Sequence, residues 1–396
     1  MRYPWNKSHK KWQKKFINSV FSNTSDNHNT FSRIILNKLE LIESKNEHLP
    51  QSLFKFYAPT SDNIMDIQKQ KIWISHPRDF NDPYDCQIGY DAASYEKHLV
   101  IQYIKQAGCV DLERKAFGFT SDEFKRILGT ITYFNWNWYK NLEDFDQVLR
   151  ELLASKDEKF VREINNMIWN SQNEANLVIE RLRMGNIRVA CFSALDRRKG
   201  FNDVIQMWSH YAHNHTGFCV EYDISPLKET GRINLECWSF YSDESKYMDE
   251  RITPILKAGL FPVIYSANRV NVPKTKLYKI ISKNKTQKSN GEIDALLYKA
   301  YIMKSAKWNY EKEWRIILDG DLCSYYDNKL PFPYVKTIYL GCKMRTETID
   351  TMILIAKDIG AEIVMMKMSD EKFILEEHSL DRYEWDKKWN SRKNPY

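Results

Sequence analysis

The hydrophobic pattern changes its period along the chain, so that strand-like segments form two clusters with a long helix-like block between them. Alternating or short apolar runs predict strands at residues 53–57, 71–75, 187–195, 216–224, 237–241, 261–266, 314–318, 335–341 and 361–368. Strands in clusters and helices in separate blocks predict an α+β fold with a mostly antiparallel sheet core, a helical insertion and a helical N-terminal segment.

Helical spacing of apolar residues predicts a helix that begins at Phe31 and is stopped by Pro50. Further helices are expected at 61–67, where Ser61 and Asp62 can form the cap, within 93–185, and at 204–213, 292–304 and 346–359. The expected parts are a polar arm and helix at 1–50, an α+β core at 51–92 and 186–345, a helical insertion at 93–185, and a C-terminal helix, strand and basic-aromatic tail at 346–396.

Composition limits the class of protein. The chain has 59 Lys and Arg against 52 Asp and Glu, and a net charge of +7 permits an anionic partner without requiring one. Seven scattered cysteines without a C-x-x-C pair indicate reduced thiols and argue against a structural zinc site. No apolar stretch approaches the roughly 18 residues of a membrane span, and the basic N-terminus lacks the apolar region of a secretory signal. We therefore expect a cytoplasmic protein without a membrane partner.

Aromatic residues are abundant, with 12 Trp, 23 Tyr and 19 Phe. Part of this set must form the core, and rings beside basic residues can also stack on nucleobases. The basic arm at 7–15 and the tail DKKWNSRKNPY have this composition and are candidate RNA or DNA contacts, although chain ends of this kind are more often solvated.

A first polar segment, Phe80–Cys86, reads FNDPYDC. Asn81, Asp82 and Asp85 can line a pocket or hold a hard cation through their oxygens. A tight turn stabilised by Asn and Asp side chains is the more common reason for such a segment.

A second segment, Met207–Asp223, places Trp208 and Tyr211 on one helix face. Its histidines do not have the spacing of a metal site, so we interpret His210 as a hydrogen-bonding or proton-transferring group. Gly217 is expected to need a positive φ at the turn into the next strand.

A third segment, Lys304–Ile316, contains Glu311, Glu313 and Arg315, which share one face if residues 311–317 form a strand. An exposed ladder of salt bridges and a paired-carboxylate site are both consistent with this pattern. In the second case, one glutamate stabilises positive charge or activates a hydroxyl.

Taken together, the segments resemble a prokaryotic family defined by a domain of unknown function. The matching positions occur in order over residues 51–343 and are Leu53–Tyr57, Phe80–Cys86, Cys191–Ser193, Met207–Asp223, Lys304–Arg315 and Val335–Gly341. The resemblance implies a shared fold and carries no established reaction.

The order of strands, with Ser193 on a central strand and a late Glu-x-Glu pair, is similar at the level of fold to ADP-ribosyltransferases. That resemblance implies NAD as substrate, Glu313 as the catalytic carboxylate and Glu311 on the acceptor side. Tyr57 or Tyr211 would then stack on nicotinamide. The chain departs from that group because its first strand lacks the Arg or His-Gly-Thr of nicotinamide recognition, so Lys55 or Arg315 would contact the pyrophosphate. The acceptor would be RNA, DNA or protein, and such proteins often act as toxins or phage-defence effectors.

Two other hypotheses remain open. A nuclease would hold Mg²⁺ with Asp82, Asp85, Glu311 and Glu313, and would use Lys304 or Lys307 at the phosphate. A non-catalytic module would bind a nucleotide or a partner with rings such as Trp308. The sequence leaves the oligomeric state open.

Candidate catalytic residues are Glu313, Glu311 and His210, and candidate binding residues are Lys55, Tyr57, Asn81, Asp82, Asp85, Ser193, Trp208, Tyr211, Lys304 and Arg315.

Overall fold

The computed structural model describes residues 47–96, 158–183, 185–196, 204–229, 259–282 and 291–379, with a few single residues and pairs outside these ranges. The described part of the chain divides into two compact units. Unit 1 comprises Met1–Gln87, Gly185–Arg269 and Gly291–Tyr396, and unit 2 comprises Ile88–Met184 and Val270–Asn290. The predicted strand at 237–241, most of the predicted N-terminal helix and the C-terminal tail lie outside the described residues.

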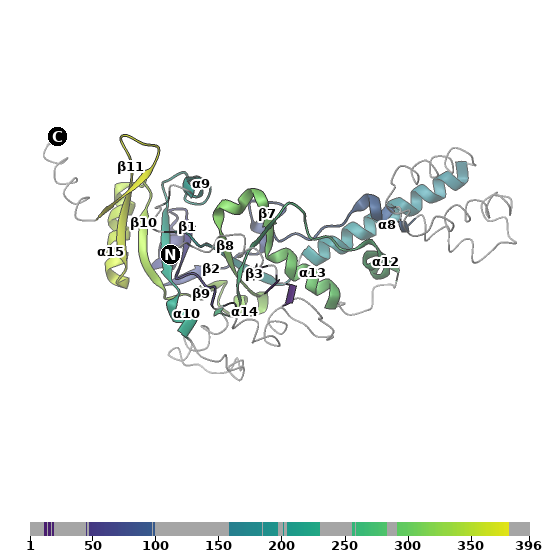
Figure 1. The fold of residues 1–396 in the computed structure, drawn as a ribbon, viewed down its shortest axis with the longest axis horizontal. Helices are drawn as coiled ribbons and strands as arrows, with labels where there is room; N and C mark the ends of the chain where they lie inside the picture. The colour runs from purple at the N-terminus through teal and green to yellow at the C-terminus, as the bar shows by residue number, and fades with distance from the viewer. Residues whose placement is uncertain are drawn as a thin grey trace. The chain divides into compact units, whose positions relative to one another are not determined.

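Unit 1 contains an eight-stranded sheet among its described residues, in the order β12-β11-β10-β4-β1-β3-β8-β5 (Figure 1). The β10–β11 pair is parallel, and the other neighbouring pairs are antiparallel. The α+β fold with a mostly antiparallel sheet is therefore confirmed. The strands are β1 (Ser52–Tyr57), β3 (Ile187–Ser193), β4 (Phe218–Asp223), β5 (Leu260–Pro262), β8 (Glu313–Asp319), β10 (Val335–Leu340), β11 (Glu362–Met368) and β12 (Leu375–Ser379).

Two small sheets and several short helices complete the described part of unit 1. β2 (Lys71–Trp73) pairs with β9 (Lys329–Pro331), and β6 (Ile264–Ser266) pairs with β7 (Met303–Ser305). The helices are α4 (Ser61–Gln68), η1 (Pro77–Asp79), α9 (Ile205–His210), α10 (Ser225–Glu229), α13 (Gly291–Tyr301), η7 (Ala306–Glu311), α14 (Gly320–Tyr325) and α15 (Thr346–Ile359).

The main sheet is covered on both faces. On one face, side chains of α4 and α15 pack with inward residues of β1, β3 and β4, which include Leu53, Phe192 and Val220. On the other face, Trp208 of α9 packs with Phe54 and other rings. Because α9 covers only part of the second face, polar side chains of β3 and β8 can lie beside it.

In unit 2, α8 (Glu158–Arg183) contacts α12 (Lys274–Ser282). The guanidinium of Arg183 donates a hydrogen bond to the backbone oxygen of Ile88, 3.0 Å away. Within the predicted helical block, residues 158–183 are thus helical, and residues 101–157 lie outside the described part. Among the described residues of the chain, no helix combines the length and the apolar character that a membrane crossing requires.

Several predicted boundaries are wrong in detail. The cap of α4 is Thr60, whose side chain accepts a hydrogen bond from the Asn63 backbone, and not Ser61 or Asp62. The predicted helix at 204–213 ends at His210, because the following turn places residues 213–215 in the left-handed region. Residues 261–266 form two strands of different sheets, and the predicted helix at 292–304 ends at Tyr301, before β7.

Gly217 precedes β4 and is required by close contact with neighbouring backbone, not by a positive φ as predicted from the sequence. Its φ is outside the left-handed region. A Cβ added there would lie 2.0 Å from the backbone oxygen of Tyr57 and 3.0 Å from that of Ala212. Neither backbone oxygen can move far, since Tyr57 belongs to the central strand β1.

We therefore expect Gly217→Ala to lower the free energy of unfolding by about 3 kcal/mol, at the upper end for an overpacked site. A matched control is Gly360→Asn, because Gly360 has a φ of 71°, which Asn tolerates, and an added Cβ meets nothing within 4 Å. Urea unfolding of both variants checks this. Equal stability of the two variants would contradict the account.

Candidate functional site

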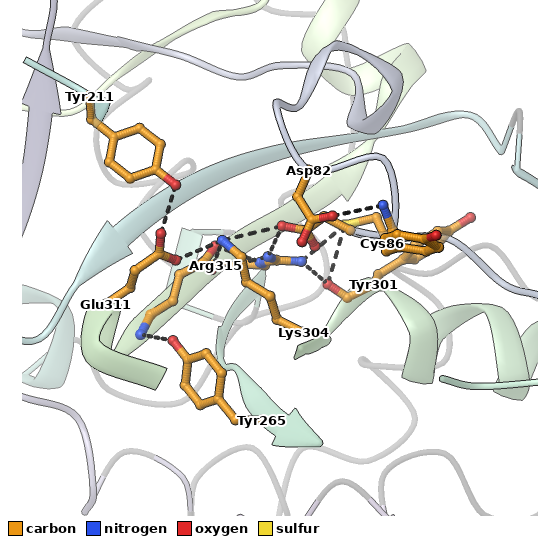
Figure 2. Close-up of polar contacts among 11 residues, drawn as sticks. Asp82, Cys86, Tyr211, Tyr265, Tyr301, Lys304, Glu311 and Arg315 are labelled. Carbon is orange, nitrogen blue, oxygen red and sulfur yellow. Dashed lines mark hydrogen bonds and ion pairs between the residues drawn. The ribbon is translucent and has the colours of Figure 1, made fainter. Parts of the chain in front are cut away.

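Five charged side chains from three segments meet in unit 1 and are almost completely buried. The segments are the Phe80–Cys86 turn, β7 and the η7–β8 connection. Figure 2 shows Tyr211 and Glu311 at one side of this group and Cys86 and Tyr301 at the other. We call it the charge cluster; its members and their exposed fractions are Asp85 (3%), Lys304 (7%), Glu311 (2%), Glu313 (3%) and Arg315 (0%).

Arg315 lies at the centre of the cluster, on β8. Its Nη2 is 2.7 Å from Oδ2 of Asp85, and its Nε is 2.7 Å from Oε1 of Glu313. Its Nη1 donates to the backbone oxygen of Tyr301 at 2.7 Å and to the sulfur of Cys86 at 3.0 Å. The guanidinium thus links β8 to the Phe80–Cys86 turn and to the end of α13.

Lys304 joins all three carboxylates of the cluster. Its Nζ lies 2.6 Å from Oε2 of Glu311, 3.1 Å from Oε2 of Glu313 and 3.4 Å from Oδ2 of Asp85. Burial by itself would lower the pKa of Lys304, but the negative charges of Glu313 and Asp85 outweigh burial and raise it. Lys304 is therefore a fixed positive charge.

Glu311 and Glu313 converge because the residue between them is left-handed. Lys312 has a φ of 47° and caps η7, so the chain turns there before β8 begins at Glu313. The predicted strand from Glu311 is therefore wrong, as is the exposed ladder of salt bridges, because both glutamates and Arg315 are buried. The paired-carboxylate arrangement is what the structure shows.

The Phe80–Cys86 segment forms a turn and also contributes to the cluster. Oδ1 of Asp82 accepts a hydrogen bond from the Tyr84 backbone at 2.9 Å, and the Asp82 backbone oxygen accepts one from the Asp85 backbone at 3.0 Å. This turn directs Asp85 toward Arg315. Asp82 thus stabilises the turn, whereas Asp85 belongs to the cluster.

The two glutamates have pKa values that move in opposite directions. Burial by itself would raise the pKa of Glu313, but Arg315 and Lys304 outweigh burial and lower it to about 2. Burial raises the pKa of Glu311, since the opposing effect of Lys304 is smaller and Glu313 adds to the rise. A pair of this kind can supply one fixed carboxylate and one group that exchanges a proton.

Aromatic residues lie on the Glu311 side of the cluster. The Tyr211 hydroxyl donates to Oε1 of Glu311 at 2.6 Å, and burial raises the pKa of this hydroxyl. The Trp308 ring lies 5.0 Å from Nζ of Lys304 and 6.1 Å from the ring of His210. Tyr211 and Trp308 are half-buried and His210 is exposed, so this side is the closest to solvent. Asn81, also exposed, hydrogen-bonds the Tyr211 hydroxyl.

Other residues named from the sequence lie elsewhere. The Tyr57 hydroxyl is 2.6 Å from that of Tyr222, and its ring stacks on Phe218 in the core. Trp208 is 0% exposed and packs in the core on the other sheet face from Tyr57, with Phe54 and its neighbouring rings.

Lys55 and Ser193 flank the cluster on neighbouring strands. Ser193 is buried opposite Glu313 in the sheet register. Nζ of Lys55 donates to the backbone oxygen of Cys191 and lies over the rings of Tyr57 and Phe192. Burial lowers the pKa of Lys55.

Sequence reasoning missed three polar partners of the cluster. Tyr265 accepts a hydrogen bond from the Glu313 backbone at 2.8 Å, and the thiol of Cys191 donates to the Glu313 carboxylate. Cys86 contacts Arg315. One sequence pattern could have indicated Cys191. Residues alternate between the two faces of a strand, so Cys191 lies on the same face of β3 as Ser193.

The ammonium of Lys304 and the guanidinium of Arg315 bind the carboxylate oxygens that a metal ion would otherwise coordinate. Within the described residues, no group of three or more His, Cys, Asp or Glu side chains is arranged to hold a metal ion. The Lys304 and Arg315 side chains pair with the three carboxylates of the cluster.

The fold and this site define an α+β protein with a buried network of three carboxylates and two cations. A family model described as "Protein of unknown function (DUF2971)" matches residues 207–316, which include most of α9, all of β4 and the Lys304–Arg315 segment. This match supports the resemblance to a family of unknown function, over a shorter range than the 51–343 inferred from the motifs. No curated protein and no solved structure matches the chain.

Acid is expected to remove the stabilising effect of Glu313. Its folded pKa is about 2, below the roughly 4.3 of an unfolded glutamate, so the unfolded chain binds more protons between these values. The contribution of Glu313, about 3 kcal/mol, is present above pH 4.3 and is lost as the pH falls toward 2. Urea unfolding of the wild type and Glu313→Gln should give a stability difference that shrinks over this range. A difference that does not change with pH would contradict the assignment.

Proposed function

We propose that the protein is a nucleotide-handling enzyme that cleaves NAD or transfers its ADP-ribosyl group, with the charge cluster as its catalytic centre. The observation that carries this proposal is the convergence of Glu311 and Glu313 with opposite pKa shifts. Lys304 and Arg315 hold the Glu313 carboxylate ionised, whereas burial raises the pKa of Glu311.

The chemistry follows from these two states. When the bond between ribose and nicotinamide breaks, nicotinamide leaves with the bonding electron pair and positive charge develops on the ribosyl group. The fixed negative charge of Glu313 stabilises that charge. Ionised Glu311 accepts the proton of the attacking hydroxyl as the new carbon–oxygen bond forms. Tyr211 orients Glu311 through its 2.6 Å hydrogen bond.

Tyr211 and Trp308 are the rings that suit nicotinamide stacking. Both rings are half-buried on the Glu311 side of the cluster, whereas the Tyr57 ring is buried in the hydrophobic core. His210 lies beside Trp308 and would donate a hydrogen bond to the substrate. An ADP-ribosyl transfer of this kind suits a toxin or phage-defence effector, with protein, RNA or DNA as acceptor.

A Mg²⁺-dependent nuclease is the second candidate. It is favoured by the proximity of Asp85 to Glu311 and Glu313, since one ammonium group bonds all three carboxylates. The same ammonium and Arg315 argue against it, because a metal would have to displace them.

The test is the incubation of purified protein with NAD that carries an isotopic label on the adenosine side. Nicotinamide release is expected, with label on protein, RNA or DNA if the enzyme is a transferase. Without release, even with cell lysate as acceptor source, the proposal is wrong. Parallel samples with Mg²⁺ and nucleic acid then test the nuclease, and a negative result in both assays would leave a binding module.

A further inference from the structure

Basic and aromatic side chains lie beside the charge cluster at the surface of unit 1. Tyr84 belongs to the Phe80–Cys86 turn and is 62% exposed. Trp308 of η7 is half-buried, and its ring centre lies 5.0 Å from Nζ of Lys304. We call this surface the basic-aromatic rim; its members are Tyr84, His210, Arg269, Lys307, Trp308 and Tyr310.

The rim presents two stacking surfaces. The guanidinium of Arg269 lies over the ring of Tyr84, 5.0 Å from the ring centre. The Trp308 ring lies 6.1 Å from the ring of His210 and 6.1 Å from that of Tyr310. Unpaired nucleobases stack on aromatic rings and on guanidinium planes, because every base has a flat π-face. Each of the two surfaces can therefore hold a base.

The two stacking surfaces flank the charge cluster. The Asn81 side chain hydrogen-bonds the Tyr211 hydroxyl, which joins the turn that carries Tyr84 to the end of α9. Figure 2 shows this turn, at Cys86, on one side of the cluster and Tyr211 on the other. A strand that contacts both surfaces would thus pass over the cluster.

The small parallel sheet of β6 and β7 brings the two basic members of the rim to the same end. Ser266 and Ser305 are the last residues of these strands and lie opposite each other. The segments that carry Arg269 and Lys307 therefore leave the sheet in the same direction. Nη2 of Arg269 also donates to the backbone oxygen of Gln87 at 3.5 Å, which holds it at the turn.

The rim carries exposed positive charge without exposed negative charge. Arg269 and Lys307 are exposed. The carboxylates in the segments that form the rim are Asp82, Asp85 and Glu311, and all three are buried. A surface of this kind attracts a polyanion such as a phosphate backbone. The segments are residues 81–87, 205–216, 264–269 and 304–312.

We propose that the basic-aromatic rim binds single-stranded RNA and that this RNA is the acceptor of the proposed transfer. Rings beside cations suit a single strand, whereas the bases of a duplex are already stacked on one another. RNA is favoured over DNA because the transfer requires an attacking hydroxyl, and each ribose within an RNA strand supplies a 2′-hydroxyl that DNA lacks. The inference deepens the proposed function and rests on it for the acceptor role, but not for RNA binding.

The transfer step balances with this acceptor. The 2′-oxygen forms a bond to the ribosyl carbon of NAD, the bond from that carbon to the nicotinamide nitrogen breaks, and nicotinamide leaves with the electron pair. The proton of the 2′-hydroxyl passes to Glu311. This glutamate lies on the side of the cluster next to Trp308, since it bonds Tyr211 at 2.6 Å and Lys304 at 2.6 Å.

The first experiment measures the fluorescence anisotropy of a labelled single-stranded RNA of about 12 nucleotides on addition of the full chain without NAD. We expect binding that weakens steeply as salt is added, because phosphate contacts release counterions. A duplex of the same sequence should bind at least about tenfold more weakly, since it cannot offer its bases to the rings.

Two variants locate the RNA on the rim. Tyr84→Leu should weaken RNA binding by about 5- to 150-fold, the effect of losing one stacked base. Arg269→Gln should weaken binding and lower its salt dependence by about one phosphate contact. The matched control is Tyr325→Leu, which should bind RNA as the wild type does, because Tyr325 on α14 is 63% exposed and lies outside the rim. Circular dichroism verifies that the variants are folded.

The second experiment adds NAD with an isotopic label on the adenosine side. It compares RNA, 2′-O-methyl RNA and DNA of one sequence, all single-stranded and with both ends blocked. We expect label on the RNA alone, because only this strand has free 2′-hydroxyls.

The inference is wrong if single-stranded RNA does not bind, if the duplex binds as tightly, or if Tyr84→Leu binds RNA as tightly as Tyr325→Leu. It is also wrong if nicotinamide is released while the RNA stays unlabelled, or if the other two strands are labelled as well.

Failure of the inference and failure of the proposed function can be told apart. RNA binding that depends on Tyr84, without release of nicotinamide, would support the RNA-binding rim and overturn the enzymatic proposal together with the acceptor role. Release of nicotinamide without RNA binding would overturn the inference and leave the enzymatic proposal intact.

Discussion

Replacement of Arg315 by methionine is expected to destabilise the protein by about 3–5 kcal/mol, because it leaves buried carboxylates without their partner. Arg315 is 0% exposed and bonds Asp85 and Glu313 at 2.7 Å each. Methionine fills a similar volume, so the loss reports the charge and the hydrogen bonds. Urea unfolding followed by circular dichroism measures it.

The matched control is Arg78→Met. The Arg78 side chain is 70% exposed and pairs with Asp79 at 3.7 Å, a surface pair that contributes little. This variant should change the stability by less than about 0.5 kcal/mol. If Arg315→Met were no more destabilising than Arg78→Met, the cluster would not stabilise the fold.

Glu311→Gln is expected to separate transfer from cleavage. If Glu311 is the base that accepts the proton from the attacking hydroxyl, its loss should lower the transfer of label to an acceptor by about 10²- to 10⁴-fold. Nicotinamide release should change only a few-fold, since Glu313 still stabilises the ribosyl cation. Both products are measured in one reaction with labelled NAD.

Glu376→Gln serves as the control, because Glu376 on β12 is 47% exposed and lies outside the cluster. It should keep both activities. Equal loss of transfer and release in Glu311→Gln would contradict the separate role of this residue.

The fold was predictable from the sequence where apolar residues alternate or recur. β1, β3, β4, β10 and α15 lie close to the predicted positions, since their inward side chains fill the core as the pattern indicates. The end of α9 was not predictable, because His213, Asn214 and His215 take left-handed backbone conformations that nothing in their side chains requires.

The site was predictable in its members and not in its geometry. The alternation of Glu311, Glu313 and Arg315 indicated a strand, but the left-handed Lys312 ends that pattern, and lysine gives no signal for such a conformation. The pairing of Asp85 with Arg315 joins residues 230 positions apart. Only the folded sheet and turn bring these residues together.

Burial could not be decided from the sequence for a related reason. The charged face of β8 was consistent with an exposed ladder as well as with a buried site, and six of its seven residues, from Glu313 to Leu318, are buried. Charges can be buried when they are paired, and the partners here come from distant segments.

The central claim is that Glu313 in the charge cluster promotes cleavage of NAD. The most direct test compares nicotinamide release by wild type and Glu313→Gln, after circular dichroism has verified that both are folded. The account predicts release by the wild type and a loss of about 10²- to 10³-fold in the variant, the usual effect of removing one preorganised electrostatic partner. A folded Glu313→Gln variant that releases nicotinamide at the wild-type rate would contradict it.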